Sequence, residues 1–205
     1  MDIKDFYLFG SKLVSSTVQV HAVGLKEFSP IDPDKTYSYD QNKLIQGDYI
    51  DISFPVVFKQ EYGKKLQDIL DTGWPSLYLI SNKIKAVLED NNFTGWQNFA
   101  INVLDKQGQE IKGYHGLSIT GRCGPVDYSK FSEIIEKRLV PNGPLVKYGK
   151  GLYVGLDKWN GGDFFVPEKS GGIVVTKRTA EALKKNKLTN VKLQNLAEIE
   201  IDQSM

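Results

Sequence analysis

The chain carries one pattern twice, and this repetition constrains its fold more than any other feature. Residues 77–103 read LYLISNKIKAVLEDNNFTGWQNFAINV, and residues 173–199 read IVVTKRTAEALKKNKLTNVKLQNLAEI. An offset of 95 positions (176 − 81) aligns the two segments without gaps. The aligned pairs include Ser81 with Thr176, Lys83 with Arg178, Leu88 with Leu183, Asn91 with Asn186, and Thr94 with Thr189.

Each segment has the local signals of a strand, a helix and a second strand. An apolar run ends at a hydroxyl residue, Ser81 or Thr176, whose side chain can cap a helix by accepting a free backbone N–H. Apolar residues then recur at helical spacing for about three turns. We therefore predict two similar strand–helix–strand units, over 77–103 and 173–199. The alternative is a chance likeness between two common motifs.

Composition places the chain among ordinary globular proteins. Its 205 residues are 40% hydrophobic, which is enough for a proper core. The 26 basic and 25 acidic residues nearly balance, so no bulk field favours nucleic acid or a membrane surface as partner. Cys123 is the only cysteine, which excludes an intrachain disulfide and a cysteine-rich metal site. We expect a reducing, cytoplasmic location, because neither an export signal nor a membrane-spanning run is evident.

The first 75 residues are expected to form strands, a long loop and a helix that pack on the rest. Residues 16–23 alternate as in a half-buried strand, and residues 28–47 look like an irregular loop. Phe58, Tyr62, Leu66, Ile69 and Leu70 fall at helical spacing. We expect residues 1–75 and 76–205 to form one compact unit.

The region between the repeated segments predicts more strands and one further helix. A polar turn at 105–108 favours a hairpin between 99–104 and 110–120. Asp127 or Ser129 could cap a helix that runs through Phe131, Ile134 and Ile135. The whole pattern predicts an α+β fold with mainly antiparallel sheets and a few short helices.

Known catalytic signatures are absent from the sequence. It contains two histidines and none of the common zinc-protease, serine-hydrolase, phosphate-loop or dinucleotide-binding motifs. Cys123 has no local support as a nucleophile, and His115 lies in phase with Leu117 and Ile119, where a core histidine is the simpler interpretation. We therefore predict no catalytic residue, no cofactor and no metal site.

Several short motifs resemble a bacterial family of immunity-protein-like domains encoded with polymorphic or contact-dependent toxins. They are the Ser81–Gly95 pattern, YHGLSITGRCGPVDYSKF at 114–131, DFF at 163–165, and the closing repeated segment. The resemblance covers roughly residues 76–198. Asn190 stands where the family pattern leads us to expect a glycine after Thr189. The resemblance implies a cytoplasmic protein that binds and blocks a cognate toxin domain, without chemistry of its own.

An inhibitor of this kind needs a few desolvated anchor residues within a polar rim. We predict five partner-binding candidates: Trp159, Asp157, Asp163, Arg122 and Tyr148. Trp159 has two interpretations, an exposed anchor or a cover over the end of a sheet.

Two other classes of function stay open at this point. One is an enzyme whose site brings together His115, Arg122 and Asp127. The other is a module that binds a small ligand or carbohydrate through tyrosines at 37–49.

Overall fold

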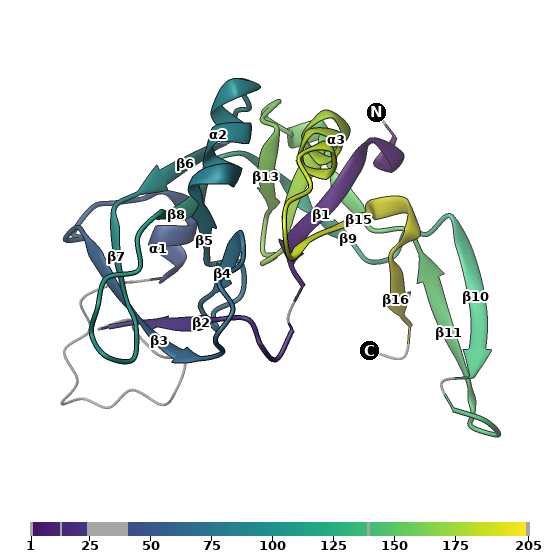
Figure 1. The fold of residues 1–205 in the computed structure, drawn as a ribbon. Helices are drawn as coiled ribbons and strands as arrows, with labels where there is room; N and C mark the ends of the chain where they lie inside the picture. The colour runs from purple at the N-terminus through teal and green to yellow at the C-terminus, as the bar shows by residue number, and fades with distance from the viewer. Residues whose placement is uncertain (1, 13, 24–40, 139, 204–205) are drawn as a thin grey trace.

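The computed structural model describes residues 2–12, 14–23, 41–138 and 140–203. Within them, the chain forms three β-sheets with a few short helices (Figure 1). Ten of the strand pairings are antiparallel and three are parallel. The predicted α+β class with mainly antiparallel sheets is confirmed.

The largest sheet has seven strands in the order β6-β8-β5-β4-β2-β3-β7. Their bounds are β2 Gln19–Ala22, β3 Val56–Tyr62, β4 Ile69–Asp71, β5 Tyr78–Ser81, β6 Trp96–Phe99, β7 Ile101–Leu104 and β8 Tyr114–Ile119. One face of this sheet buries an apolar cluster that includes Phe58, Leu77 and Phe99. Helix α1 (Gln41–Gln46) closes that cluster with Leu44, which is fully buried.

The second sheet has six strands in the order β12-β9-β13-β14-β1-β15. Their bounds are β1 Phe6–Ser11, β9 Arg122–Asp127, β12 Tyr153–Gly155, β13 Phe164–Pro167, β14 Ile173–Thr176 and β15 Val191–Asn195. Strand β1 lies between β14 and β15, so the start of the chain completes a sheet built largely from its end.

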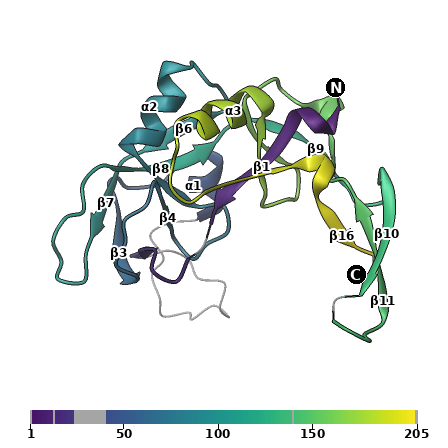
Figure 2. The ribbon, with the colours of Figure 1, turned by 45° about the vertical axis from the view of Figure 1, so that its right-hand side comes forward.

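A third sheet of three strands extends from the body as an arm, with the order β10-β11-β16 (Figures 1 and 2). Strands β10 (Glu133–Arg138) and β11 (Leu145–Lys150) form a long hairpin, and β16 (Glu200–Asp202) pairs with the base of β11. In both views β10 is the outermost strand of the arm.

Helices α2 (Asn82–Asp90) and α3 (Lys177–Lys185) pack together over a core that the two large sheets share. Helix α2 buries Ile84, Val87 and Leu88, and α3 buries Thr179, Ala180 and Leu183. Short 3₁₀ turns η1 (Ile3–Asp5), η2 (Leu156–Lys158) and η3 (Leu196–Glu198) pack with an apolar cluster on the face of the six-stranded sheet opposite to α2 and α3.

The two N-cap hydroxyls behave differently from each other. Ser81 accepts the backbone N–H of Ile84 at 3.3 Å, as predicted. Thr176 occupies the N-cap position of α3 but makes no capping hydrogen bond. Its hydroxyl donates to Asp163, as the Ser81 hydroxyl donates to Asp68, and lies 3.0 Å from the Thr179 hydroxyl.

Strand pairings in the two large sheets recur at the same 95-residue offset as the sequence pattern. Ile69 pairs with Ile80 between β4 and β5, and Phe164 pairs with Val175 between β13 and β14. Trp96 of β6 and Val191 of β15 are also 95 positions apart and both lie in antiparallel pairs, but their partners, Ile119 and Ser11, do not share the offset.

The structure does not form the two further helices that apolar spacing predicted, one near residues 58–70 and one after Asp127. Residues 58–70 contribute to β3 and β4, and residues 133–138 form β10. In each case the apolar residues lie along strands or turns and contact different neighbours. Their separation by three or four positions therefore does not mark the buried face of a helix. The predicted hairpin between 99–104 and 110–120 is found in part. Phe99 pairs antiparallel with Gly116, and Leu104 forms an antiparallel bridge with Glu110. Between these points β7 pairs in parallel with β3 instead.

Candidate functional site

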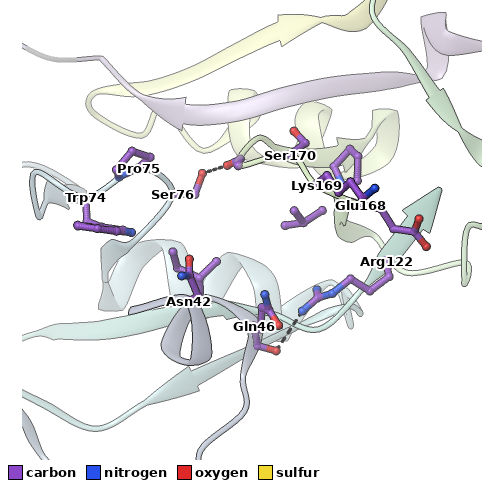
Figure 3. A pocket seen from close by; sticks show the side chains of 13 residues that line it. Asn42, Gln46, Trp74, Pro75, Ser76, Arg122, Glu168, Lys169 and Ser170 are labelled. Carbon is purple, nitrogen blue, oxygen red and sulfur yellow. Dashed lines mark hydrogen bonds between the residues drawn. The ribbon is translucent and has the colours of Figure 1, made fainter. Parts of the chain in front are cut away.

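A cleft of about 620 Å³ lies between the two large sheets (Figure 3). One wall comes from α1 and the turn between β4 and β5, and the other comes from β13 and the loop that follows it. Its apolar lining residues are Ile45, Trp74, Pro75, Val166 and Pro167. Its polar lining residues are Asn42, Gln46, Ser76, Arg122, Glu168, Lys169 and Ser170.

A hydrogen bond ties the two walls together at one end of the cleft. The Ser76 hydroxyl donates to the carbonyl of Gly171, and Ser76 is buried (Figure 3). The Ser76 backbone has φ +63°, a left-handed conformation that its hydrogen-bonded surroundings hold in place. Nearby, the Thr72 hydroxyl donates to the Leu77 carbonyl at 2.8 Å and fixes the turn that carries Trp74. The wall is therefore set by hydrogen bonds rather than by loose loop packing.

Arg122 supplies the cationic group of the cleft. Its guanidinium donates to the carbonyls of Ile119 (2.5 Å), Gly121 (2.7 Å) and Gln46 (3.3 Å), and it reaches across toward Gln46 in Figure 3. No carboxylate among the described residues forms an ion pair with it. Burial lowers the pKa of Arg122, although a guanidinium stays protonated at any physiological pH. The cleft thus holds a positioned, partly desolvated cation that has no charged partner in the part of the chain that the structure describes.

Asp163 lies in a different place and is buried, with 4% of its surface exposed. Arg178 donates to both of its oxygens, at 2.6 and 2.5 Å. The Thr94 backbone N–H and hydroxyl donate to one oxygen, and the Thr176 hydroxyl donates to the other. Burial by itself would raise the pKa of Asp163, but the bonds from Arg178, Thr94 and Thr176 outweigh it and lower that pKa. This carboxylate joins three elements and has no free lone pair for a partner.

Asp68 makes a corresponding set of contacts 95 positions earlier. It accepts from the backbone N–H of Thr189 at 2.6 Å and from the Thr189 hydroxyl at 2.9 Å. The Ser81 hydroxyl donates to its other oxygen at 2.7 Å. Burial opposes ionisation here too, yet these bonds and the charge of Lys83 lower the pKa of Asp68. Each aspartate therefore links the helix start of one segment to the threonine that follows the helix of the other.

The remaining predicted candidates lie apart from the cleft. The Trp159 ring packs edge-on against Phe6 at 5.3 Å and lies 5.6 Å from Phe165, and its indole N–H donates to the Gly162 carbonyl. Asp157 is exposed on η2. Tyr148 is buried on β11, with the Lys137 ammonium 4.4 Å from its ring centre. Of these residues, only the Trp159 loop approaches Arg122, through Asn160, whose N–H donates to the Arg122 carbonyl.

The residues considered for an enzyme do not converge in the described structure. His115 contacts the side-chain oxygen of Asn82 at 2.7 Å, and burial together with Lys85 lowers its pKa. Asp127 accepts from Ser129, two positions away. No described hydrogen bond or ion pair joins His115, Arg122 and Asp127.

The tyrosines considered for a ligand site lie partly within the described residues. Tyr37, Tyr39 and Asp40 lie outside the described residues. Tyr49 forms a hydrogen bond with Ser118 at 3.0 Å and packs against Phe54 and Phe99, so it is partly buried at the edge of the core. No group of three or more histidine, cysteine or acidic side chains suited to a metal occurs among the described residues. In the same part of the chain, no helix is long and apolar enough to cross a membrane.

Comparison with known protein families shows to which family this chain belongs. Residues 5–198 match the immunity protein family Imm11. The chain belongs to this family. The match covers both large sheets, the cleft and most of the arm, so the resemblance inferred from residues 76–198 extends over almost the whole Imm11 chain. A search of curated proteins found no match.

Membership in an immunity protein family points to toxin neutralisation and to a toxin as partner. Sequence reasoning selected Arg122 but missed the other cleft residues of this Imm11 protein. The one available signal was Gly73-Trp74-Pro75, where a tryptophan between two turn-forming residues indicates a ring held at the surface.

Proposed function

We propose that this Imm11 protein acts in the cytoplasm by binding its cognate toxin domain and occluding the toxin's working surface. The observation that carries the proposal is the cleft with Arg122, a partly desolvated guanidinium with no carboxylate partner among the described residues. The lone, buried Cys123 fits a reducing compartment.

The chemistry of the cleft indicates what part of a toxin it would accept. Ile45, Trp74, Val166 and Pro167 offer apolar contact, which lowers dissociation rates once water is expelled. Arg122 offers a positive charge suited to a carboxylate, in addition to the three backbone carbonyls to which it donates. The matching segment is a protruding toxin loop with an apolar side chain next to an acidic one.

In this proposal, the other partner-binding candidates predicted from the sequence contact the toxin at the periphery of the interface. Asp157 is exposed and free to meet a basic group. Trp159, Asp163 and Tyr148 each have contacts within the fold, so their substitution must be controlled for stability.

The test is co-expression of the affinity-tagged chain with the toxin domain encoded beside its gene. We expect the two proteins to elute at equal stoichiometry and the toxin's activity to be blocked in the complex. Elution of the chain alone, with the toxin fully active, would refute the proposal.

A matched pair of variants locates the interface. Arg122→Gln keeps a donor for the neighbouring carbonyls but removes the charge, and we expect it to weaken toxin binding by about 2 kcal/mol or more. Lys169→Gln removes a charge from the exposed rim of the same cleft and should change affinity by less than about 1 kcal/mol. Equal affinities for both variants, with unchanged melting temperatures, would move the interface away from Arg122.

We also infer that residues 77–103 and 173–199 are two similar strand–helix–strand units. Support comes from the common offset of 95 in the sequence, in the strand pairings and in the contacts of Asp68 and Asp163. The cleft then lies between equivalent turns, because Ser76 and Gly171 are also 95 positions apart. Parallel effects of substitutions at equivalent positions test this inference, as developed below for the two aspartates.

A further inference from the structure

The arm ends in a strand whose outer edge has no partner within the described chain. Strand β10 pairs with β11 on one side, and the sheet order β10-β11-β16 leaves its other side open. Figures 1 and 2 show that side facing away from the body of the molecule. An open edge presents unpaired N–H and C=O groups that can accept another strand.

The residues of β10 decide which strand fits. When two identical strands pair antiparallel about a two-fold axis, one residue must lie opposite itself. Centring the pair on Ile135 sets Ile135 against its own copy and sets Glu133 against Lys137 on both sides. Centring it on Glu136 or Lys137 instead sets that charged residue against its own copy at the axis. The Lys137 register also sets Glu136 against Arg138, so only the Ile135 register has opposite-charge pairs and no like-charge pair. Centring it on Ile134 sets Glu133 against Ile135 and forms no charge pair between copies in β10.

We propose that β10 pairs with β10 of a second copy of this chain, antiparallel and centred on Ile135. The pairing joins the two arms into one continuous sheet of six strands. Opposite charges directly across an antiparallel pair stabilise it and like charges destabilise it, so the charge order of β10 selects this register. Lys137 already bonds Glu200 of its own chain, and Glu133 of the second copy adds a further carboxylate beside it.

The proposed dimer does not depend on the toxin-binding proposal. No residue of β10 lines the cleft, so pairing of the two arms leaves the cleft of each copy uncovered by β10. A contact of five paired residues from each strand is small by the standards of stable interfaces. The association should therefore be weak and dependent on concentration.

Sedimentation velocity over an about hundredfold range of protein concentration tests the proposal. The unmodified chain should shift from monomer to dimer. Glu133→Lys alone sets lysines against Lys137, and Lys137→Glu alone sets glutamates against Glu133, so each variant should stay monomeric. An equal mixture of the two variants restores both opposite-charge pairs and should dimerise again.

Matched controls keep the result interpretable. Glu181→Lys and Lys177→Glu make the same charge changes on the exposed face of α3 and should leave the dimer intact. Lys137→Glu also removes the ion pair between Lys137 and Glu200 within the arm. Ile135→Arg keeps that ion pair and places two like charges at the two-fold axis, so it should prevent dimerisation without this side effect. A chain that stays monomeric at every concentration, or a mixture that stays monomeric while both variants fold, would overturn the proposal.

Discussion

Cys123 illustrates how burial sets the chemistry of a single side chain. It lies on β9 within the core of the six-stranded sheet, with 1% of its surface exposed. Burial raises the pKa of the Cys123 thiol to about 11, and the charges of Glu168 and Asp157 add to the rise. Since the thiolate is the reactive form, this cysteine is both hidden and protonated at neutral pH.

We predict that Cys123 resists thiol reagents in the folded protein. At pH 8, a chromogenic disulfide reagent should label it only after a denaturant is added, because unfolding restores both access and an ordinary pKa. Rapid labelling of the native protein at the rate of a free thiol would contradict this description.

Trp159 is the residue for which the sequence left two interpretations, and its contacts point to a structural contribution. Its ring closes a cluster with Phe6 and Phe165 on the face of the six-stranded sheet opposite to α2 and α3. Trp159→Ala should therefore lower the free energy of unfolding by about 3 kcal/mol, whereas Trp159→Phe should recover most of the loss. Denaturant titration measures both changes.

Toxin affinity separates the two contributions of Trp159. If the ring also contacts the partner, Trp159→Phe will weaken toxin binding although the variant stays folded and keeps most of its stability. A Trp159→Ala variant as stable as the unmodified chain would show that the aromatic cluster contributes little.

At the scale of elements, Asp163 and Asp68 connect each helix start to the threonine of the other repeated segment. Asp163→Asn removes the ion pair with Arg178 and weakens the bonds from Thr94, so we expect a loss of about 2 kcal/mol in stability. Asp68→Asn should cost about 1 kcal/mol, because Asp68 is more exposed and lacks an arginine partner. Urea unfolding of both variants checks the order.

The same aspartates predict how stability varies with pH. Both carboxyls have a folded-state pKa below the unfolded value of about 4. Their contribution is therefore fully present above pH 4 and is lost as the pH falls through the lower folded values. Asp163→Asn should flatten the acid side of the stability curve. An unchanged acid slope would mean that the Asp163 carboxylate is not stabilised in the fold.

One element boundary shows why local sequence patterns are informative but incomplete. Gly95 has φ +80°, and a Cβ there would lie 2.1 Å from the Phe164 carbonyl oxygen, so glycine is required. Asn190 takes the equivalent position with φ +46°, and its side-chain amide both donates to and accepts from the Ile69 backbone. The glycine expected from the family pattern is thus replaced by a residue that tolerates the same backbone and adds two hydrogen bonds.

At the scale of the molecule, local signals predicted the helices at 82–90 and 177–185, but the pairing of distant strands was not readable. Nothing in Phe6–Ser11 indicates that this strand completes a sheet whose other strands lie between residues 122 and 195. Phe131, Ile134 and Ile135 have helical spacing, but residues 133–138 form a strand. Successive residues of a strand point to opposite faces, so Ile134 and Ile135 lie on opposite faces of an exposed hairpin.

The candidate site could be predicted only in part for the same reason. Arg122 was selected from sequence, whereas Trp74 and Pro167 reach the cleft through strands that are far apart along the chain. A cleft between two sheets depends on long-range packing, which periodicity does not encode.

Hydrogen–deuterium exchange of the chain, alone and bound to its toxin domain, tests the central claim most directly. If the cleft receives the toxin, exchange should slow in residues 41–46, 74–77 and 166–172. The exposed backbone of β10 should exchange alike in both states at concentrations where the chain is monomeric. Protection confined to the arm or to other surfaces, with the cleft segments unchanged, would contradict toxin binding at the cleft.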